Sequence, residues 1–323
     1  MGHLILTVTM NVALDRSLRV PNFQLGHRHR ASDAFAQAGG KGINVARALK
    51  HLDLPVVATG LAGGRTGTRV VEELTAEGIL NDFVRITDES RTSTIVVDET
   101  GGTSTEVYER GPDVAPEELS MLLEKIAYLG RGADLVVFAG SLPRGVEDGF
   151  YGEAIRECNR RRVRAVLDAE GQALRLGVEG EPWLVSPNQR EAESLVGQEF
   201  HDDEDFLMAL DAIAELGARN VLIGHDTGAY LLDRAERRVQ RFTASIPPVE
   251  TVTQVTGTGD AMLAGYLAAR VAEESAEIAL RRAVAVGAAA TLTVGGGQFD
   301  RREAQRLEGA VSVGVLAHAG HDG

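Results

Sequence analysis

Only one cysteine, Cys158, occurs in the 323 residues of this sequence, which excludes an internal disulfide and a metal site built from several cysteines. We interpret Cys158 as a small buried hydrophobic residue. Long apolar runs are also lacking, because the longest, residues 283–294, falls short of the roughly 20 residues that span a membrane. The first nine residues are too short for a signal peptide and lack its basic flank. We therefore expect a cytoplasmic protein with no membrane partner.

Blocks of like charge are missing as well. The 33 basic and 47 acidic residues give a net charge of −14 and are spread along the chain. An acidic surface repels DNA, RNA and anionic lipid, so we expect no nucleic-acid partner. The same charge sets a condition, because an anionic substrate would need basic residues gathered locally. With 44% of its residues apolar, the chain can bury a large core.

What the sequence does contain is an alternation of strand and helix patterns. Short apolar or β-branched runs, typical of buried strands, occupy residues 4–9, 56–60, 134–139, 163–168, 183–185 and 220–223. Amphipathic helical patterns occupy residues 43–51, 68–77, 116–129, 149–160 and 202–216. Strands that alternate with helices predict a parallel sheet covered on both faces. Since no linker divides the sequence, it predicts a single α/β domain over residues 1–323.

Two segments break the alternation. Residues 17–35 hold no good helix pattern, and residues 92–98 and 103–108 are typical of a hairpin around the turn-rich segment 99–102. Strands inserted in this way need not join the main sheet. We expect a small β lid, formed by about residues 11–36 and 90–110, over the carboxyl edge where open α/β sheets bind ligands.

The sharpest motif is VTGTGDAM at residues 255–262, which precedes a helical pattern. Its small residues bring backbone N–H groups together at a helix N-terminus, where unpaired donors and the helix dipole bind anions. An acid there would repel a bound phosphate, but Asp260 fits a general base that accepts a proton from a hydroxyl. On this motif alone, a glycine-rich turn with Asp260 as a helix cap is an equal alternative. The motif is neither a dinucleotide fingerprint nor a P-loop.

A second glycine-rich segment, AGGKGINVA at residues 38–46, opens another helix. Its glycines, Gly39 and Gly40 among them, let a ligand approach the backbone closely. Lys41 supplies a cation, and the Asn44 amide can bond a sugar hydroxyl. The alternative is a flexible turn with a solvated lysine.

Together, AGGKGINVARAL and TGTGDAMLAG resemble the two signature regions of the ribokinase-like (PfkB) carbohydrate kinases. The segments TVTMNVALD, ATGLAGGRTG, AGSLPRG and SPNQREAE resemble further family motifs and follow in the family's order. The resemblance covers nearly the whole chain. It is closest to the branch of 1-phosphofructokinase and tagatose-6-phosphate kinase, which LILTVTMNVALD and TEVYERGPDV resemble. It implies a ribokinase-like fold, with a central, mostly parallel sheet flanked by helices and a small β-sheet lid.

The resemblance also implies roles for single residues. Asp260 matches the family's catalytic base, and Gly257, Thr258 and Gly259 match its anion hole, which also contacts the nucleotide. The substrate-binding positions are Asp15, Gly39, Gly40, Lys41, Asn44, Arg91 and Ser141, and the nucleotide side adds Asn188, Glu191, Gly224 and Gly228. Asn188 and Glu191 match an Asn-x-x-Glu motif that holds Mg²⁺ through water. The implied cofactors are ATP and Mg²⁺, a need for a monovalent cation stays open, and lids that pair between subunits imply a homodimer.

Arginines help to identify the subfamily, because a phosphorylated sugar needs cations at its phosphate. Arginine can bind a phosphate through two parallel hydrogen bonds. Arg91 begins the expected hairpin and matches the arginine that this branch uses for the substrate phosphate. We expect Arg91 and Lys41 together to neutralise that phosphate. Arg28, Arg30, Arg110 and Arg144 are further candidates, and we expect no more than two or three of the five to touch ligand.

The departures from the family pattern concern the nucleotide side. Ser186 replaces a frequent lysine, the segment Ile223 to Asp226 differs ahead of the nucleotide loop, and Gln254 and Val255 differ ahead of the late glycines. They leave open the preferred phosphate donor. His225 fits either an adenine or phosphate contact or a loop histidine without a ligand role.

The sequence thus predicts an ATP-dependent enzyme, a carbohydrate kinase whose partners are a sugar phosphate and a nucleotide. It would phosphorylate fructose 1-phosphate or tagatose 6-phosphate to the bisphosphate, and it does not say which. One rival is a kinase of an unphosphorylated sugar or a nucleoside. The other is a non-catalytic sugar-phosphate sensor, against which the joint presence of Asp260, Asn188 and Glu191 argues.

Overall fold

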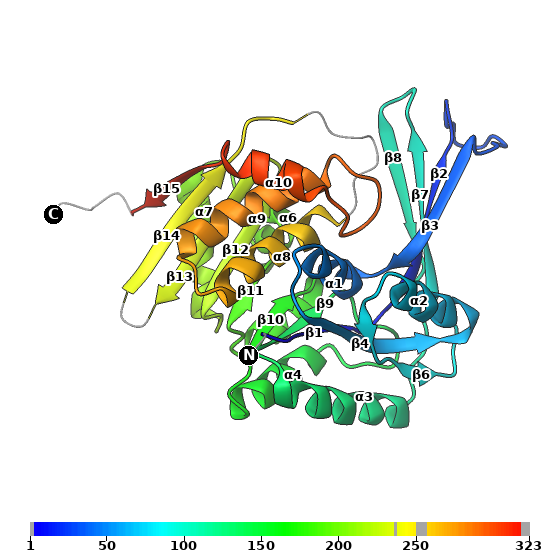
Figure 1. Ribbon diagram of the computed structural model, residues 1–323, viewed down its shortest axis with the longest axis horizontal. Coiled ribbons are helices and arrows are strands. Elements are labelled where there is room, and N and C mark those ends of the chain that lie inside the picture. The colour runs from blue at the N-terminus through cyan, green and yellow to red at the C-terminus, as the bar shows by residue number, and fades with distance from the viewer. Residues whose placement is uncertain (1–2, 236–237, 250–256, 318–323) are drawn as a thin grey trace.

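Strands and helices alternate along most of the chain, as the sequence pattern predicts (Figure 1). The structure is a computed structural model that describes residues 3–235, 238–249 and 257–317. The main sheet holds β1 (Ile5–Thr9), β4 (Val56–Gly63), β5 (Leu80–Asn81), β6 (Val84–Ile86), β9 (Leu135–Ala139), β10 (Arg164–Asp168), β11 (Leu184–Val185), β12 (Asn220–His225), β13 (Gly228–Ala235), β14 (Arg238–Ser245) and β15 (Ser312–Leu316). All six expected strands are present, which confirms an α/β fold.

The strand order in the main sheet is β15-β14-β13-β12-β11-β10-β9-β1-β4-β5, and β6 also pairs with β4. Every pairing from β12 to β5 is parallel, whereas β12, β13, β14 and β15 pair antiparallel. The sheet is therefore mostly parallel, with an antiparallel extension at one edge that the sequence pattern did not predict.

Helices cover both faces of this sheet (Figure 1). One face carries α1 (Lys41–His51), α2 (Gly64–Ala76), α8 (Thr258–Val271), α9 (Ala276–Ala290) and α10 (Arg301–Glu308). The other carries α3 (Pro116–Leu129), α4 (Phe150–Arg160), α5 (Gly171–Val178), α6 (Gln189–Val196) and α7 (Asp203–Glu215), and a 3₁₀ turn spans Gly130–Gly132. The central strands supply both cores, because successive side chains point to opposite faces.

Local sequence signals explain where several helices begin. The Asp202 carboxylate accepts hydrogen bonds from the amides of Glu204 and Asp205, so it caps α7, whose first turn is also acidic.

Cys158 is buried in the core between α4 and the sheet, which confirms its interpretation as a small hydrophobic residue. Among the residues that the structure describes, none of the helices combines the length and the hydropathy that a membrane span requires.

A second, separate sheet has the strand order β3-β2-β7-β8. It consists of β2 (Ala13–Arg19), β3 (Asp33–Gly39), β7 (Arg91–Asp98) and β8 (Thr103–Tyr108), and it projects from the main body beside α1 and α2 (Figure 1). The antiparallel pairing of β7 with β8 confirms the expected hairpin. Strand β8 is exposed along its whole length. Strands β2, β7 and β8 lie within the two segments expected to form a lid, and β3 begins in the first of them and extends past it to Gly39.

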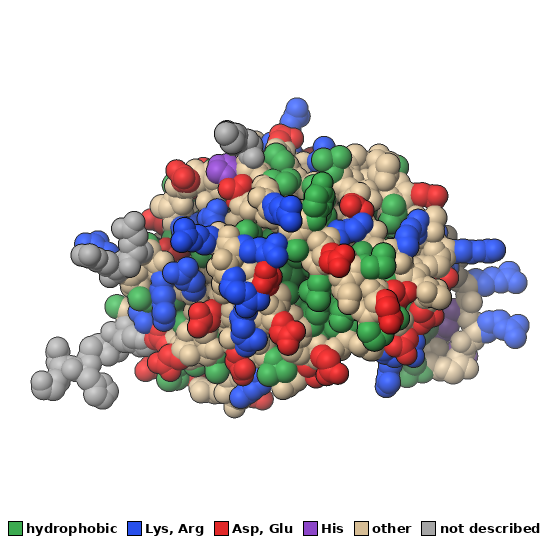
Figure 2. All heavy atoms as spheres, turned by 90° about the horizontal axis from the view of Figure 1, so that it is seen from below, with side chains coloured by type: hydrophobic (Ala, Val, Ile, Leu, Met, Phe, Trp, Pro, Cys, Tyr) green, Lys and Arg blue, Asp and Glu red, His purple; other side chains and the backbone are tan. Residues whose placement is uncertain are grey.

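Charges of both signs are mixed on the surface. Figure 2 shows acidic and basic side chains interspersed over the face that lies beneath α3 and α4 in Figure 1. This mixture agrees with the absence of like-charge blocks in the sequence.

Candidate active site

A cleft of about 1510 Å³ lies at the carboxyl ends of the parallel strands. Its lining includes Thr9 at the end of β1, Gly140 just after β9, Asp168 at the end of β10, Ser186 just after β11 and His225 at the end of β12. Side chains that end neighbouring parallel strands meet at one edge, which is where α/β sheets bind ligands. The small sheet borders the same cleft through Asp15, Arg91 and Tyr108, among others.

The N-terminus of α8 points a set of backbone amides at the cleft. Gly257 adopts a left-handed conformation with φ of 73° and ψ of 22°. The amide of Ala261 donates to the carbonyl of Gly257 at 3.0 Å and is the first bond of the helix. The amides of Thr258 and Gly259 precede that bond and have no partner within the helix. Both residues line the cleft, so this turn can bind an anion.

Asp260 lies in the first turn of α8 and is only 4% exposed. Its Oδ2 accepts a hydrogen bond of 2.8 Å from the Nδ2 of Asn44. Burial and the neighbouring Asp168 carboxylate raise the pKa of Asp260 to about 7, against the opposing effects of Lys41 and Asn44. A carboxylate with such a pKa is suited to take a proton from a hydroxyl near neutral pH.

Lys41 is clamped by two carboxylates inside the cleft. Its Nζ lies 2.8 Å from the Oδ1 of Asp168 and 3.1 Å from the Oε1 of Glu191. Burial alone would lower the pKa of Lys41, but the two carboxylates outweigh it and raise that pKa. The expected contact of Lys41 with a substrate phosphate therefore stays a prediction. Asp168 was not singled out from the sequence, although an acid that ends a predicted strand is a usable signal.

Asn188 and Glu191 hold each other at the start of α6. The Oδ1 of Asn188 accepts from the Glu191 amide, and the Oε2 of Glu191 accepts from the Asn188 amide, both at 2.9 Å. This capping box fixes the Glu191 carboxylate beside Lys41. Within the described residues, no three acidic, histidine or cysteine side chains form a metal cluster. Mg²⁺ commonly uses one or two carboxylates together with waters and phosphates, and Asp168 and Glu191 fit that use.

The other end of the cleft is built on the small sheet. Asp15 lies on β2, beside Gln37 on β3 and Ser93 on β7. A Cβ atom on Gly39 would lie 1.9 Å from the Oδ2 of Asp15, so only glycine leaves room for this carboxylate. Burial raises the pKa of Asp15, and the nearby Arg91 opposes that shift. Gly39 is thus a supporting residue behind Asp15.

Asn11 joins three of the elements at this end. Its carbonyl accepts from the Nε of Arg91 at 3.4 Å, and its Nδ2 donates to the Oγ of Ser141 at 3.2 Å and to the Arg110 carbonyl at 3.4 Å. Asn11 therefore fixes the backbone and side chains around the cleft. It was not predicted as a site residue, although it lies in the segment TVTMNVALD at residues 7–15.

Three arginines, Arg91, Arg110 and Arg144, line both the cleft and an adjoining hollow of about 340 Å³. Arg144 pairs with Asp88 at 3.4 Å. The Arg91 guanidinium lies 5.7 Å from the centre of the Tyr108 ring, and the Arg110 side chain makes no hydrogen bond or ion pair with any residue that the structure describes. Arg28 and Arg30 do not line either space.

The opposite part of the cleft is largely apolar. Its lining includes Ile246, Val249, Met262, Val284 and Ala288, which come from the segment after β14 and from α8 and α9. Such a surface can receive a flat aromatic base. The predicted glycines Gly224 and Gly228 also line this part.

The departures Ser186, His225 and Asp226 all line the cleft too. Burial lowers the pKa of His225, whose ring lies 5.3 Å from that of Tyr230 and 5.6 Å from that of Phe206. Two further departures, Gln254 and Val255, lie outside the described residues.

The structure brings the predicted site residues together. Those that line this cleft are Asp15, Gly40, Lys41, Asn44, Arg91, Ser141, Asn188, Glu191, Gly224, Gly228, Gly257, Thr258, Gly259 and Asp260. Only Gly39 lies behind the lining, against Asp15. An acid of raised pKa beside helix-terminal amides, with two carboxylates nearby, can deprotonate a hydroxyl and bind phosphate groups.

Comparisons with known proteins agree with this chemistry. The profile described as "pfkB family carbohydrate kinase" matches residues 8–302. Phosphofructokinase-2 from Escherichia coli, solved with substrates and products, is 29% identical, with a TM-score of 0.87 over 94% of this chain and 98% of that one. The same enzyme has been solved with potassium and as an inhibited tetramer. A Thermotoga maritima protein described as a "Possible 1-phosphofructokinase" is 27% identical, with a TM-score of 0.87 over 98% and 100% of the two chains.

A more distant neighbour shows the fold alone. Ribokinase from Arabidopsis thaliana, solved with ribose and ATP, is 21% identical, with a TM-score of 0.74 over 95% of this chain and 99% of that one. Its likeness confirms the ribokinase-like architecture, with a mostly parallel sheet, flanking helices and a separate small sheet.

Proposed function

Because the chain belongs to the pfkB family of carbohydrate kinases, we propose that it transfers the γ-phosphoryl group of ATP to a hydroxyl of a ketohexose phosphate. Fructose 1-phosphate and tagatose 6-phosphate are the two acceptors that the sequence resemblance suggests, and the product is the bisphosphate. The general activity, that of a carbohydrate kinase, follows from the family itself and from the phosphofructokinase neighbours.

The observation that carries the choice of a phosphorylated acceptor is the set of arginines at the small-sheet end of the cleft. Arg91 and Arg110 face the 340 Å³ hollow with guanidinium donors that no described carboxylate occupies. The acids that share the hollow are engaged by backbone amides. Asp88 accepts from Asp113 at 2.8 Å, and Glu109 accepts from Thr92 at 2.8 Å. The arginine donors are thus available for a phosphate group.

In the proposed reaction, the chain's own groups do three things. Asp260 accepts the proton of the acceptor hydroxyl as its oxygen bonds to the γ-phosphorus and the bond to the leaving ADP oxygen breaks. The amides of Gly257, Thr258 and Gly259 stabilise the negative charge of the transferring group. Asp15 and Asn44 orient the sugar. All these residues line one cleft.

The nucleotide side supplies the remaining groups. Glu191 and Asp168 would hold Mg²⁺, with Asn188 fixing Glu191 through the capping box. When bound, Mg²⁺ neutralises charge on the phosphate oxygens. The apolar surface around Met262 and Val284 suits the adenine ring. The potassium complex of the Escherichia coli enzyme supports testing a monovalent cation here as well.

Arg91→Ala is expected to raise the KM for the sugar phosphate by about 10- to 150-fold, because hydrogen bonds to charged groups contribute about 1.5–3 kcal/mol. The KM for ATP should change little. Steady-state kinetics with each substrate varied in turn measures the difference. The matched control is Arg16→Ala, which removes an exposed arginine of the same small sheet that lies outside the cleft lining. Equal losses with phosphorylated and unphosphorylated acceptors would show that Arg91 does not bind phosphate.

A coupled assay over a panel of sugars and sugar phosphates decides the acceptor. Fructose 1-phosphate or tagatose 6-phosphate should give the highest kcat/KM. A neutral sugar or nucleoside that outperforms every sugar phosphate would favour the rival kinase and contradict the proposal.

We propose also that the small sheet acts as a lid and pairs with a second copy. Strand β8 is exposed throughout, and Phe35, Val107 and Tyr108 are exposed apolar side chains on this sheet. Hydrogen exchange across residues 92–108 should slow when sugar phosphate and nucleotide are added together. If exchange is slow at high protein concentration without ligand and does not change on adding it, the segment is a dimer contact and not a closing lid.

A further inference from the structure

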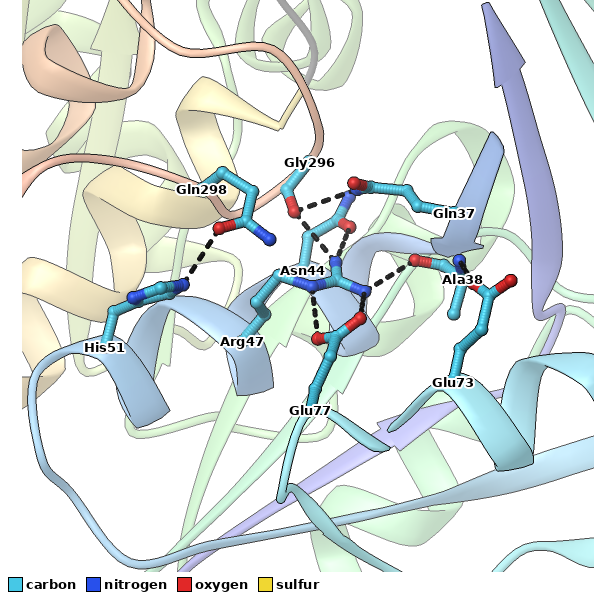
Figure 3. A network of polar contacts seen from close by, with 9 residues as sticks. All are labelled: Gln37, Ala38, Asn44, Arg47, His51, Glu73, Glu77, Gly296 and Gln298. Atoms are coloured by element: carbon cyan, nitrogen blue, oxygen red, sulfur yellow. Dashed lines mark hydrogen bonds and ion pairs between the residues drawn. The ribbon is translucent and has the colours of Figure 1, made fainter. Parts of the chain in front are cut away.

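Arg47 on α1 is a charged side chain buried to 1% exposure, and it lies outside the lining of the cleft. Its guanidinium has five N–H donors, and each has a protein acceptor. The Nε and one Nη2 donor bind the two carboxylate oxygens of Glu77 at 2.7 and 3.0 Å, and the second Nη2 donor binds the Ala38 carbonyl at 2.8 Å. The two Nη1 donors bind the Asn44 Oδ1 at 3.2 Å and the Gly296 carbonyl at 2.8 Å (Figure 3).

The contact between Arg47 and Asn44 fixes which end of the Asn44 amide faces Asp260. A guanidinium only donates hydrogen bonds, so the oxygen of the amide must face Arg47. The NH₂ end must then point the other way, where Nδ2 lies 2.8 Å from the Oδ2 of Asp260. A carboxylate needs a donor at that distance, so the two contacts select the same orientation.

The same guanidinium fixes the loop that contains Gly295, Gly296 and Gly297. The Gly296 carbonyl accepts from Arg47 and also from the Nε2 of Gln37 at 3.2 Å (Figure 3). This loop packs against both Asn44 and the anion-binding turn. A Cβ on Gly296 would lie 2.4 Å from the Asn44 Oδ1, and a Cβ on Gly257 would lie 3.0 Å from the Gly296 Cα.

We propose that Arg47 is a positioning residue for phosphoryl transfer: it holds the Asn44 amide so that its NH₂ group faces Asp260, and it seats Gly296 against the N-terminus of α8. The inference rests on the proposed function only in that it takes Asp260 as the base. Arg47 acts through Asn44 and not on the substrate, since it is buried and lies outside the lining of the cleft.

Arg47→Lys tests the proposal, because lysine keeps the charge beside Glu77 but has only three donors and no fork. We expect kcat to fall by about 10- to 100-fold, since a hydrogen bond to a charged group is lost, while the KM for ATP changes little. The part of the loss that Arg47 exerts through Asn44 should disappear in an Asn44→Ala background, so the loss there should be clearly smaller. The same loss in both backgrounds would overturn the proposal.

Two further variants separate positioning from folding. Arg241→Lys makes the same replacement at another arginine that binds one carboxylate, Asp211, through two nitrogens, outside the cleft lining, and it should leave kcat unchanged. Gly296→Ala disturbs Asn44 while the Arg47 side chain itself is kept, because the new Cβ would lie 2.4 Å from the Asn44 Oδ1. It should lower kcat without changing the KM for ATP, even if Arg47→Lys folds poorly. A fully active Gly296→Ala variant would contradict the role of this loop.

A readout without turnover keeps this inference separate from the proposed function. In a crystal structure of Arg47→Lys, the Asn44 side chain should turn away from Asp260. An unchanged contact of Asn44 with Asp260 would overturn the positioning role, whatever the acceptor. A wild-type enzyme that phosphorylates none of the sugar phosphates, by contrast, would contradict only the proposed function.

Discussion

Asp260→Asn is expected to lower kcat by about 10²–10⁴-fold, the usual cost of losing a positioned general base. The KM values should change little, because asparagine has nearly the same shape and its oxygen can still accept the bond from Asn44. Steady-state kinetics with saturating ATP measures the effect. A variant that keeps more than a tenth of the wild-type kcat would remove Asp260 from this role.

The pH dependence of the wild-type enzyme should carry the signature of the same group. The pKa of Asp260 is raised from 3.8 to about 7, and only the ionised carboxylate can accept a proton. The kcat/KM should therefore be lost as the pH falls through about 7 and be retained above it. A profile that stays flat from pH 5 to 8 would contradict the assignment.

Stability gives an independent check on this variant. The unfolded chain ionises Asp260 near 3.8 and the folded chain near 7, so the folded state loses stability as the pH rises between these values. Asparagine has no proton to lose, so Asp260→Asn should have an equal or higher Tm than the wild type at pH 8.

The matched control for the loss of kcat is Asp233→Asn. Asp233 is another buried acid whose pKa burial raises, and it pairs with Arg270 outside the cleft lining, so its replacement should leave kcat unchanged.

Local patterns predicted much of this molecule because they depend on neighbours in the chain. The expected strands follow from short apolar runs, and the Gly257 turn follows from a glycine-rich segment that opens a helix. The antiparallel strands β13 to β15 escaped prediction because their alternation is weak. In β14, for example, only Phe242 and Ala244 are buried.

Pairings across long sequence distances could not be read from one sequence. Lys41 meets Asp168 across 127 positions and Glu191 across 150, and Asn44 meets Asp260 across 216. The sequence motifs name the chemical groups but not their partners. For this reason Lys41 was expected at the sugar phosphate, whereas its ammonium lies between two carboxylates in this structure. Asn11, Asp168 and Arg47 were not singled out for the same reason.

Lys41→Met is expected to lower kcat by about 10²–10³-fold, because it removes a cation from the place where phosphoryl charge is bound. Lys41 also opposes the rise in the pKa of Asp260. Its loss should raise that pKa further, so the acidic limb of the kcat/KM profile should move to higher pH. Kinetics at several pH values measures both effects. Lys50→Met, which removes an exposed lysine of the same helix, is the matched control and should change neither.

The same variant decides between the two roles of Lys41. If the lysine is mainly the counter-ion of Asp168, Glu191 and Asp260, its loss leaves these acids facing one another and raises the pKa values of Glu191 and Asp260 in the folded state. The folded chain then loses stability as the pH rises, so the Tm deficit of Lys41→Met should be larger at pH 8 than at pH 6. If instead Lys41 grips the phosphate of the sugar, the KM for the sugar phosphate should rise as in Arg91→Ala. In that case the acidic limb should stay where it is, and the Tm deficit should not depend on pH.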